Sequence, residues 1–221
     1  MEFDFKGRIY ILRHGQTECN RNGLWYCPPE SHINDEGVRQ AEEVRSVIEK
    51  ISPEKIYCSP YQRCVDTSKV IMENYSDADF KIHQCLGERN FKGVEGLDSN
   101  GIMDRFNISM DHSPITRNID HVPGIEASSS FHQRVNACFG QIMSDSRECK
   151  NLLIVSHGGV MWSLVYQKLL LTPKPRTFLN CALLGIDFRN GTFEPFFSMN
   201  MRTDWYSDIN PSWSIFWVIG E

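Results

Sequence analysis

The sequence predicts an α/β fold of three layers, in which helices cover both faces of a mostly parallel central sheet. Short apolar runs alternate with segments whose apolar residues recur at helical spacing, as in consecutive strand–helix units. The first run, 8–12, is apolar on both faces, which is typical of a strand covered on both sides. No repeat, low-complexity tract or Gly/Ser-rich linker divides the 221 residues, so we expect one domain over residues 1–221.

Local patterns define the elements of the first half. A helix is predicted from the N-cap Asn34 to the residue before Pro53, and a strand over 55–58 follows. Ser59 and Pro60 then predict a second helix, with serine as its N-cap and proline at its first position. Inward-facing residues at helical spacing are Val38, Ala41, Val44, Ile48 and Ile51 in the first helix, and Tyr61, Cys64 or Val65, Ser68, Ile71 or Met72, and Tyr75 in the second.

The second half continues the alternation after a short strand predicted over 80–84. Residues 98–127 are polar and contain Pro114 and Pro123, which predicts a loop-rich, lid-like excursion with one helix near 100–108. A third helix is marked by Phe131, Val135, Cys138 or Phe139, and Ile142. The remaining predicted elements are a strand over 152–155, a helix over 160–171, and a hairpin whose strands, 181–187 and 192–197, flank an Asn190-Gly191 turn.

Charge and cysteine usage exclude several classes of protein. The chain carries 23 basic and 28 acidic side chains, a net charge of −5, which argues against a nucleic-acid or membrane-surface partner. No run reaches 18 apolar residues, and the N-terminus lacks the apolar core of a secretion signal, so we expect a soluble, cytoplasmic protein. The 8 cysteines form no C-x-x-C pair and no zinc spacing. We therefore expect reduced thiols, no disulfide and no structural metal.

Three polar clusters directly follow predicted strands. The first cluster begins with Arg13-His14-Gly15. The second begins with Ser59-Pro60 and includes Arg63, and the third is Ser156-His157-Gly158-Gly159. Because open α/β sheets bind ligands at the carboxyl ends of their parallel strands, we expect the three clusters to meet in one crevice.

This set of side chains suits a phosphoryl group. The guanidinium groups of Arg13 and Arg63 can hold its oxygens, and backbone N–H groups after Ser59 and Gly158 add further donors. A neutral imidazole can attack phosphorus and divide the displacement into two easier steps. The sequence contains no Walker A motif or paired metal-binding carboxylates, so we expect no metal and no cofactor.

A nucleophilic histidine needs an acid that protonates the departing oxygen and later activates water. Glu88, shortly after the predicted strand over 80–84, is one candidate, and Glu95 is the other. Their spacing alone does not separate them.

Taken singly, each of these residues has an ordinary structural explanation, such as a surface helix charge for Arg63 or a surface carboxylate for Glu88. Their joint occurrence after three apolar strands favours a functional site. We expect structural roles for the other histidines, which are His32, His83, His112, His121 and His132.

With these motifs in view, the chain resembles the histidine phosphatase superfamily, whose fold is phosphoglycerate mutase-like, from Arg8 to about Phe197. The family motif R-H-G-x-T-x-x-N is matched at 13–20 and S-P-x-x-R-x-x-x-T at 59–67. The second histidine motif is matched at 156–159, and Pro123-Gly124-Ile125-Glu126 is similar to the family's P-G-G-E-S segment.

The resemblance implies roles for these positions. His14 would be the phosphorylated nucleophile, and His157 would stabilise the transferring group. The family's acid segment aligns without a gap on 86–96, which would make Glu88, not Glu95, the proton donor. Arg13, Arg63 and Asn20 would hold the phosphoryl oxygens, and Thr17, Gly23, Glu88 and Gly158 would complete the phosphate site. Lys92 and Val94 depart from the family's acid segment, so the resemblance does not specify the substrate.

The resemblance implies a metal-independent phosphomonoester hydrolase, a histidine acid-type phosphatase. The interval between Glu88 and His157 is similar to that of the family's phosphatases, and Asn90-Phe91 replaces the His-Tyr pair of its mutases. A phosphoglycerate mutase-type phosphotransferase is the alternative, and a non-catalytic phospholigand-binding module is a third. The expected partner is a small phosphorylated substrate, with a phosphoprotein as the alternative.

Overall fold

The computed structural model describes residues 5–73, 77–108, 119–171, 175–189 and 192–203. Its central sheet has six strands in the order β3-β2-β4-β1-β5-β6. The strands are β1 (Arg8–Arg13), β2 (Lys55–Cys58), β3 (Asp79–Ile82), β4 (Asn151–Ser156), β5 (Pro175–Arg189) and β6 (Thr192–Thr203). The helices are α1 (Glu18–Arg21), α2 (Asp35–Ile51), α3 (Gln62–Ile71), α4 (Ser99–Phe106), α5 (Ser128–Asp145) and α6 (Gly158–Ser163).

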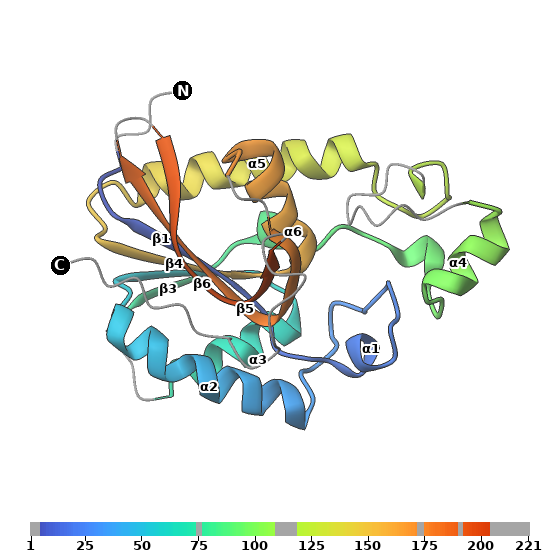
Figure 1. Ribbon diagram of the computed structural model, residues 1–221, viewed down its shortest axis with the longest axis horizontal. Coiled ribbons are helices and arrows are strands. Elements are labelled where there is room, and N and C mark those ends of the chain that lie inside the picture. Colours follow the sequence, from blue (N-terminus) through green and yellow to red (C-terminus); the bar gives the residue numbers. More distant parts are fainter. Residues whose placement is uncertain (1–4, 74–76, 109–118, 172–174, 190–191, 204–221) are drawn as a thin grey trace.

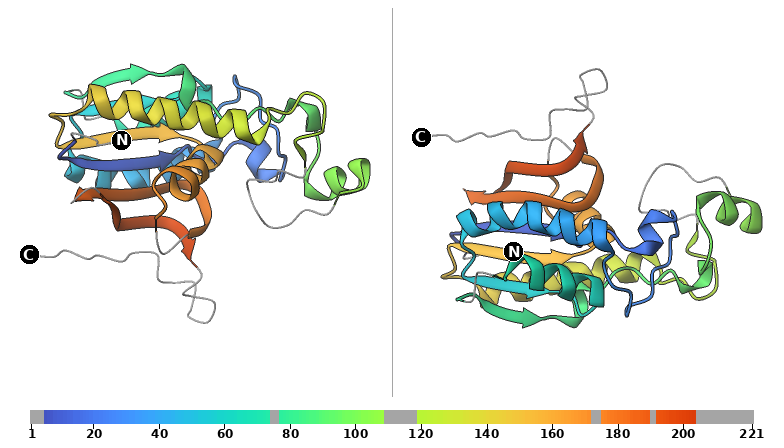
Figure 2. Two further views of the ribbon diagram at one scale, coloured as in Figure 1. Left: turned by 90° about the horizontal axis from the view of Figure 1, so that it is seen from above. Right: turned by 90° about the horizontal axis from the view of Figure 1, so that it is seen from below.

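The first four strands of that order are parallel, and β5 and β6 continue the sheet in antiparallel pairing. In Figure 1, α5 lies on one side of the sheet and α2 and α3 lie on the other. In Figure 2, α5 lies in front of the sheet in the view from above, and α2 and α3 lie in front of it in the view from below. The predicted fold class, three layers around a mostly parallel central sheet, is confirmed.

Alternation along the strands builds the two cores. Ile9 and Ile11 of β1 pack with α5 and α6 on one face, whereas Tyr10 and Leu12 pack with α2 and α3 on the other. β4 divides its side chains in the same way between the two faces. Because both faces are apolar, β1 and β4 are continuous apolar runs in the sequence.

The second predicted helix begins later than expected. Tyr61 is the N-cap of α3, which starts at Gln62, so Ser59 is not an N-cap and Pro60 is not its first residue. The Ser59 hydroxyl instead accepts the Tyr61 N–H and shares a hydrogen bond with His157. Of the predicted inner stripe, Cys64, Ser68 and Ile71 are buried, and Tyr75 lies outside the described residues.

Three further expectations need correction. The helix predicted over 160–171 is α6 followed by a π-helical turn over Leu164–Lys168, in which the Leu169 N–H donates to the Leu164 carbonyl. The strand predicted over 80–84 ends at Ile82 because Gln84 begins a 3₁₀ turn, η1 (Gln84–Leu86). The hairpin strands are longer than predicted, and the Asn190-Gly191 turn between them lies outside the described residues.

The expectation of eight reduced cysteines is also wrong. A disulfide joins Cys85 to Cys138, and the other six cysteines are free. The two cysteines are 53 residues apart in the sequence and meet only because η1 packs against α5. A local spacing pattern therefore cannot predict this disulfide.

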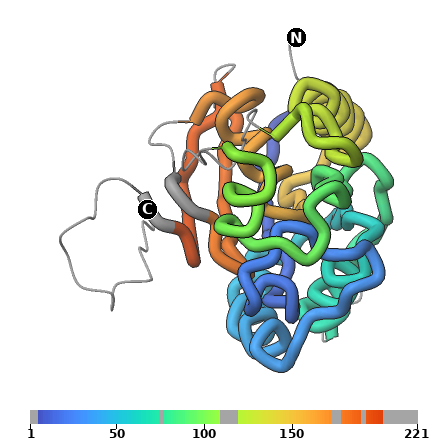
Figure 3. The backbone as a smooth tube through the Cα atoms, turned by 90° about the vertical axis from the view of Figure 1, so that its right-hand side faces the viewer, coloured from blue at the N-terminus to red at the C-terminus, as the bar shows by residue number. Residues whose placement is uncertain are grey.

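The excursion predicted over 98–127 carries the expected helix, α4, and its Pro114 lies outside the described residues. Figure 1 shows α1 and α4 at the same end of the molecule, beyond the carboxyl ends of the parallel strands, and Figure 3 looks directly onto that end. A small apolar cluster of Val94, Ile102, Ile119 and Val122 lies in this region. No helix in the described ranges combines the length and apolar character needed to cross a bilayer.

Candidate active site

The sheet register brings the three polar clusters together, as predicted. Arg13 at the end of β1 is level with Ser156 on β4, and Cys58 at the end of β2 is level with Val155. His14, Ser59 and His157 therefore follow at one edge of the sheet. A cavity of about 970 Å³ opens there. Seven of the predicted site residues line it: Arg13, His14, Asn20, Gly23, Arg63, Glu88 and Gly158.

His14 is held as a neutral imidazole, and its second nitrogen makes no hydrogen bond to the part of the chain that the structure describes. Its Nδ1 lies 2.7 Å from the Gly15 carbonyl oxygen, and because a carbonyl only accepts, Nδ1 carries the proton. Burial, followed by the positive charges of Arg63 and Arg13, holds the pKa of His14 well below its usual range. The Nε2 lone pair is therefore available for attack at neutral pH.

Backbone contacts fix the loop that carries His14. The Gly15 N–H donates to Thr67 Oγ1 at 3.0 Å, which connects the loop to α3. A Cβ atom at Gly15 would lie 2.6 Å from the Gly37 carbonyl oxygen, so the loop approaches α2 this closely only with glycine.

The two arginines use only part of their hydrogen-bonding capacity on the protein. Arg13 Nη1 donates to the Phe178 carbonyl at 2.7 Å, and Arg63 Nη1 donates to the Pro28 carbonyl at 3.0 Å. Within the described residues, the buried Nε of each arginine has no hydrogen-bond partner. Both side chains line the cavity, so their remaining donors can hold an anion such as a phosphoryl group.

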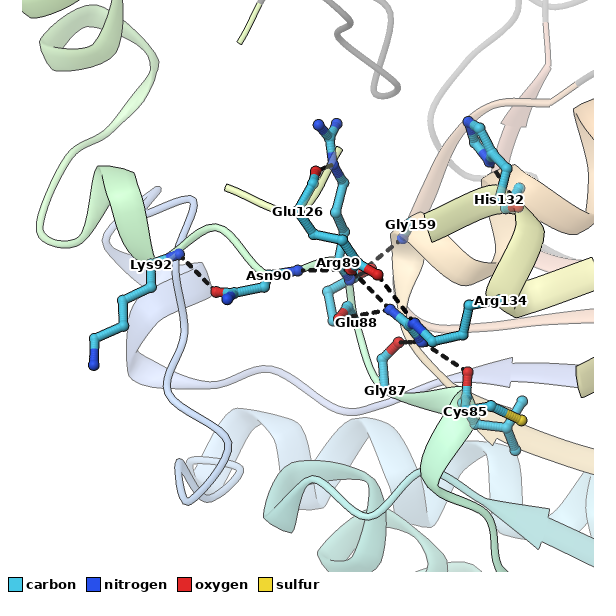
Figure 4. A network of polar contacts seen from close by, with 12 residues as sticks. Cys85, Gly87, Glu88, Arg89, Asn90, Lys92, Glu126, His132, Arg134 and Gly159 are labelled. Carbon is cyan, nitrogen blue, oxygen red and sulfur yellow. Dashed lines mark hydrogen bonds and ion pairs between the residues drawn. The ribbon is translucent and has the colours of Figure 1, made fainter. Parts of the chain in front are cut away.

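Glu88 is the acid at the cavity. Its Oε2 accepts the Gly159 N–H and its Oε1 accepts the Arg89 N–H, each at 2.9 Å. Figure 4 shows the carboxylate between these two backbone groups. Glu95 is exposed and does not line the cavity. The geometry therefore favours Glu88 over Glu95, the alternative that spacing alone left open.

Two predicted site residues lie behind the cavity surface. Thr17 is fully buried as the N-cap of α1, where its side chain accepts the Asn20 N–H. His157 is also fully buried, and its Nε2 lies 2.7 Å from Ser59 Oγ. Its ring centroid is 5.2 Å from that of His14, and burial, with the charge of Arg63, holds its pKa well below the usual range.

The chain and its site match a known protein family. A family model of the histidine phosphatase superfamily (branch 1) matches residues 9–196. The chain belongs to the histidine phosphatase superfamily. The resemblance drawn from the three motifs is thus confirmed.

Individual proteins to which this superfamily member is similar differ in their named activities. The adenosylcobalamin/alpha-ribazole phosphatase of Salmonella typhimurium is 28% identical over 167 residues, which cover 75% of this chain and 81% of that protein. The agropine synthesis reductase of Rhizobium rhizogenes is 28% identical over 166 residues, 70% of this chain, but only 34% of that protein is covered. The crystal structure of a Bacillus anthracis phosphoglycerate mutase shares the fold, with a TM-score of 0.75 and 19% identity over 89% of this chain and 94% of that one.

A polar residue on β5, Asn180, contacts the active-site loop and was not among the predicted site residues. Asn180 Nδ2 donates to the His14 carbonyl at 3.3 Å and to Asn20 Oδ1 at 3.0 Å. Asn20 Oδ1 also accepts the Thr17 N–H, so the amide oxygen of Asn20 is fully used within the protein. Asn180 is a polar residue directly before the strand predicted to begin at Cys181, and this position was the one feature of the sequence that could have indicated its role.

The aromatic walls of the cavity were missed as well. Trp25 packs edge-to-face on Phe91 with ring centroids 5.6 Å apart, and Trp162 packs in the same way on Phe178 at 5.6 Å. All four side chains line the cavity, together with Tyr26. They come from segments far apart in the sequence, and no spacing connects them before the fold is known.

Gly159 provides a test of the Glu88 position. A Cβ atom there would lie 2.3 Å from Glu88 Oε1, so Gly159→Ala should push the carboxylate out of place. We expect kcat/KM to fall on the order of 10²-fold, the cost of misplacing a reacting group by about 1 Å. Gly140→Ala on α5, where a Cβ meets nothing within 4 Å, is the matched control and should leave kcat/KM unchanged. Equal activity of both variants in a steady-state assay would contradict the position assigned to Glu88.

Proposed function

We propose that the protein is a phosphomonoester hydrolase of the histidine acid type that acts through a phosphohistidine on His14. The observation that carries the proposal is a neutral His14 whose Nε2 makes no hydrogen bond to the described residues, and which is near enough to Arg63 and Arg13 for their charges to lower its pKa. Both arginines retain unused donors. A phosphoryl group bound by Arg13 and Arg63 would present its phosphorus to that nitrogen, and the preorganised charges would stabilise the transferring group.

The proposed reaction has two steps. In the first, His14 Nε2 forms a bond to phosphorus while the bond to the ester oxygen breaks, and Glu88 gives that oxygen its proton. The Gly15 carbonyl accepts a hydrogen bond from His14 Nδ1–H, and this contact stabilises the positive charge on the ring of the phosphohistidine. In the second step, Glu88 removes a proton from water, and the water oxygen bonds to phosphorus while the bond between phosphorus and His14 Nε2 breaks. Phosphate is released and the neutral imidazole of His14 is restored. The neutral His157 ring supports His14 and Ser59 from behind the cavity.

The donor set supports a route without a metal ion. Among the described residues that line the cavity, Glu88 is the only carboxylate and His14 the only imidazole. A two-metal phosphatase site requires several such ligands close together, whereas here two guanidinium groups can neutralise the phosphoryl charge.

The cavity walls favour an ester with a bulky aromatic or apolar group. Trp25 and Phe91 line the cavity, as do Trp162 and Phe178. The cavity cations other than Arg13 and Arg63 are Arg89, which is paired with Asp120, and Lys92. A small substrate with a second acidic group, as in a phosphoglycerate mutase reaction, would therefore have Lys92 as its one further unpaired cation among the described residues that line the cavity.

The experiment is a phosphate-release assay with and without EDTA. The substrates are phosphomonoesters with aromatic groups, small phosphorylated acids and a phosphopeptide. We expect inorganic phosphate to appear, EDTA to have no effect, and kcat/KM to be highest for aromatic esters. A loss of activity in EDTA that a divalent ion restores would contradict the metal-free route. Transfer of phosphate to an acceptor hydroxyl without release would instead support the mutase.

We further propose a cytoplasmic location and one domain over residues 1–221. Six of the eight cysteines are free, which is usual in a reducing compartment. The net charge of −5 supports a small phosphorylated substrate over a nucleic acid.

A further inference from the structure

The Cys85–Cys138 disulfide is unusual for a chain with this cysteine usage. Small proteins that depend on disulfides for stability pair most of their cysteines, whereas six of eight are free here. Where a disulfide occurs among reduced thiols, it is typically transient and has a redox role. The bond is therefore better explained as a reversible modification than as a permanent crosslink.

An imidazole lies directly against the bond. His83 Nδ1 is 2.9 Å from Cys85 Sγ and 3.8 Å from Cys138 Sγ. A histidine at this distance can protonate a departing thiolate, and it can later favour the thiolate form that attacks when the bond is remade. Cys85 is half-buried and Cys138 is fully buried, so an incoming thiol reaches Cys85 first.

The bond also connects two parts of the active-site support. Cys85 stands three residues before Glu88, and Cys138 lies one helical turn after Arg134 on α5. Arg134 donates to the carbonyl oxygens of Cys85 at 2.8 Å and Gly87 at 3.0 Å, as Figure 4 shows. The segment that positions Glu88 is thus held to α5 by a guanidinium group and by a covalent bond.

We propose that Cys85 and Cys138 form a reversible thiol–disulfide site, assisted by His83, that a dithiol opens and that positions the Glu88 segment when closed. One thiolate of the dithiol attacks Cys85 Sγ, which forms a mixed disulfide and releases Cys138 as a thiolate that takes a proton from His83. The second thiolate of the dithiol then attacks the dithiol sulfur of the mixed disulfide, and the bond from that sulfur to Cys85 breaks. The Cys85 thiolate takes a proton from His83, which has regained one from solvent. Two electrons and two protons pass to the cysteine pair, and the dithiol leaves as its own disulfide.

The first test is alkylation of the folded protein in dithiothreitol, followed by peptide mass spectrometry. We expect Cys85 to be alkylated while the buried free cysteines Cys58 and Cys64 stay protected, which shows that the chain remains folded. His83→Gln should slow the opening roughly tenfold. Alkylation of Cys85 only together with Cys58 and Cys64 would show a permanent crosslink and overturn the proposal. So would stoichiometric Zn²⁺ retained by the reduced protein, because the same three residues would then be metal ligands.

The second test is functional and rests on the proposed role of Glu88. Reduction should lower kcat for an alkyl phosphate roughly tenfold and lower the melting temperature by roughly 5–15 °C. Cys85→Ser should show the lower kcat and the lower melting temperature without dithiol, and dithiol should cause no further change. Cys138→Ala provides the same comparison if Cys85→Ser does not fold. Cys149→Ala, which removes a free cysteine outside the site, should respond to reduction with the same relative changes in kcat and melting temperature as the unaltered protein. Unchanged kcat and melting temperature on reduction would overturn the positioning role. Alkylation and melting do not require turnover, so they test the thiol–disulfide site even if the phosphatase proposal fails.

Discussion

His14→Gln should reduce phosphate release by roughly 10⁴–10⁶-fold, the loss that follows removal of a nucleophile from a preorganised site. The glutamine side chain occupies a similar volume but cannot form a covalent phosphoryl intermediate. Steady-state assays with a phosphate ester, accompanied by circular dichroism and melting curves, measure the effect. His32→Gln is the matched control, because His32 is exposed, pairs with Asp66, and neither residue lines the cavity. Its kcat/KM should stay within about twofold of the unaltered protein.

The lowered pKa of His14 adds a pH dependence to this prediction. Because the neutral form is the nucleophile and its folded-state pKa lies well below 6.5, protonation of His14 should not limit turnover as pH falls to about 6.5 and somewhat below. An acid limb of kcat/KM centred at 6.5 and assigned to His14 by isotope-edited NMR would contradict a buried, neutral imidazole. If His14→Gln retained turnover, His14 would not be the nucleophile and the proposed mechanism would be wrong.

Glu88→Gln should separate substrates by their leaving groups. An alkoxide leaves poorly without a proton, so the phosphorylation step with an alkyl phosphate should slow on the order of 10²–10⁴-fold, the usual contribution of a general acid. p-Nitrophenolate leaves without protonation, so its release should slow far less. Burst kinetics are required, because Glu88 is also the proposed base of the second step and its loss limits steady-state turnover.

Glu95→Gln is the control for this experiment, because Glu95 is exposed and outside the cavity. It should retain the activity of the unaltered protein with both substrates. If Glu95→Gln rather than Glu88→Gln showed the dependence on leaving group, the assignment of the acid would be wrong. An equal loss for both substrates in Glu88→Gln would indicate that the carboxylate only holds the Gly159 loop.

Much of the fold could be predicted because its central strands, β1 and β4, are buried on both faces. The runs at β1 and β4 are continuously apolar, and the polar residues that follow them, such as His14 and His157, mark the strand ends. Parallel pairing then brings those ends to one edge without any further information. The cavity position of Arg63 and Glu88 agrees with the same reasoning.

Features that depend on tertiary contact could not be predicted in this way. Ser59 has the sequence context of an N-cap, but its hydroxyl is bound to His157, so α3 starts at Gln62. Cys85 and Cys138 meet across 53 residues through the packing of η1 on α5. Asn180 and the aromatic walls come from elements whose neighbours are set only by the assembled sheet and loops.

The most direct test of the central claim is to locate the phosphate on the enzyme during turnover. The protein is mixed with a ³²P-labelled phosphomonoester, denatured within milliseconds, digested under alkaline conditions and mapped by mass spectrometry. We expect acid-labile, base-stable phosphate on the peptide that contains His14, formed and lost at rates that match turnover, and absent from His14→Gln. Phosphate on His157, or full turnover with no labelled peptide at any quench time, would contradict a phosphohistidine on His14.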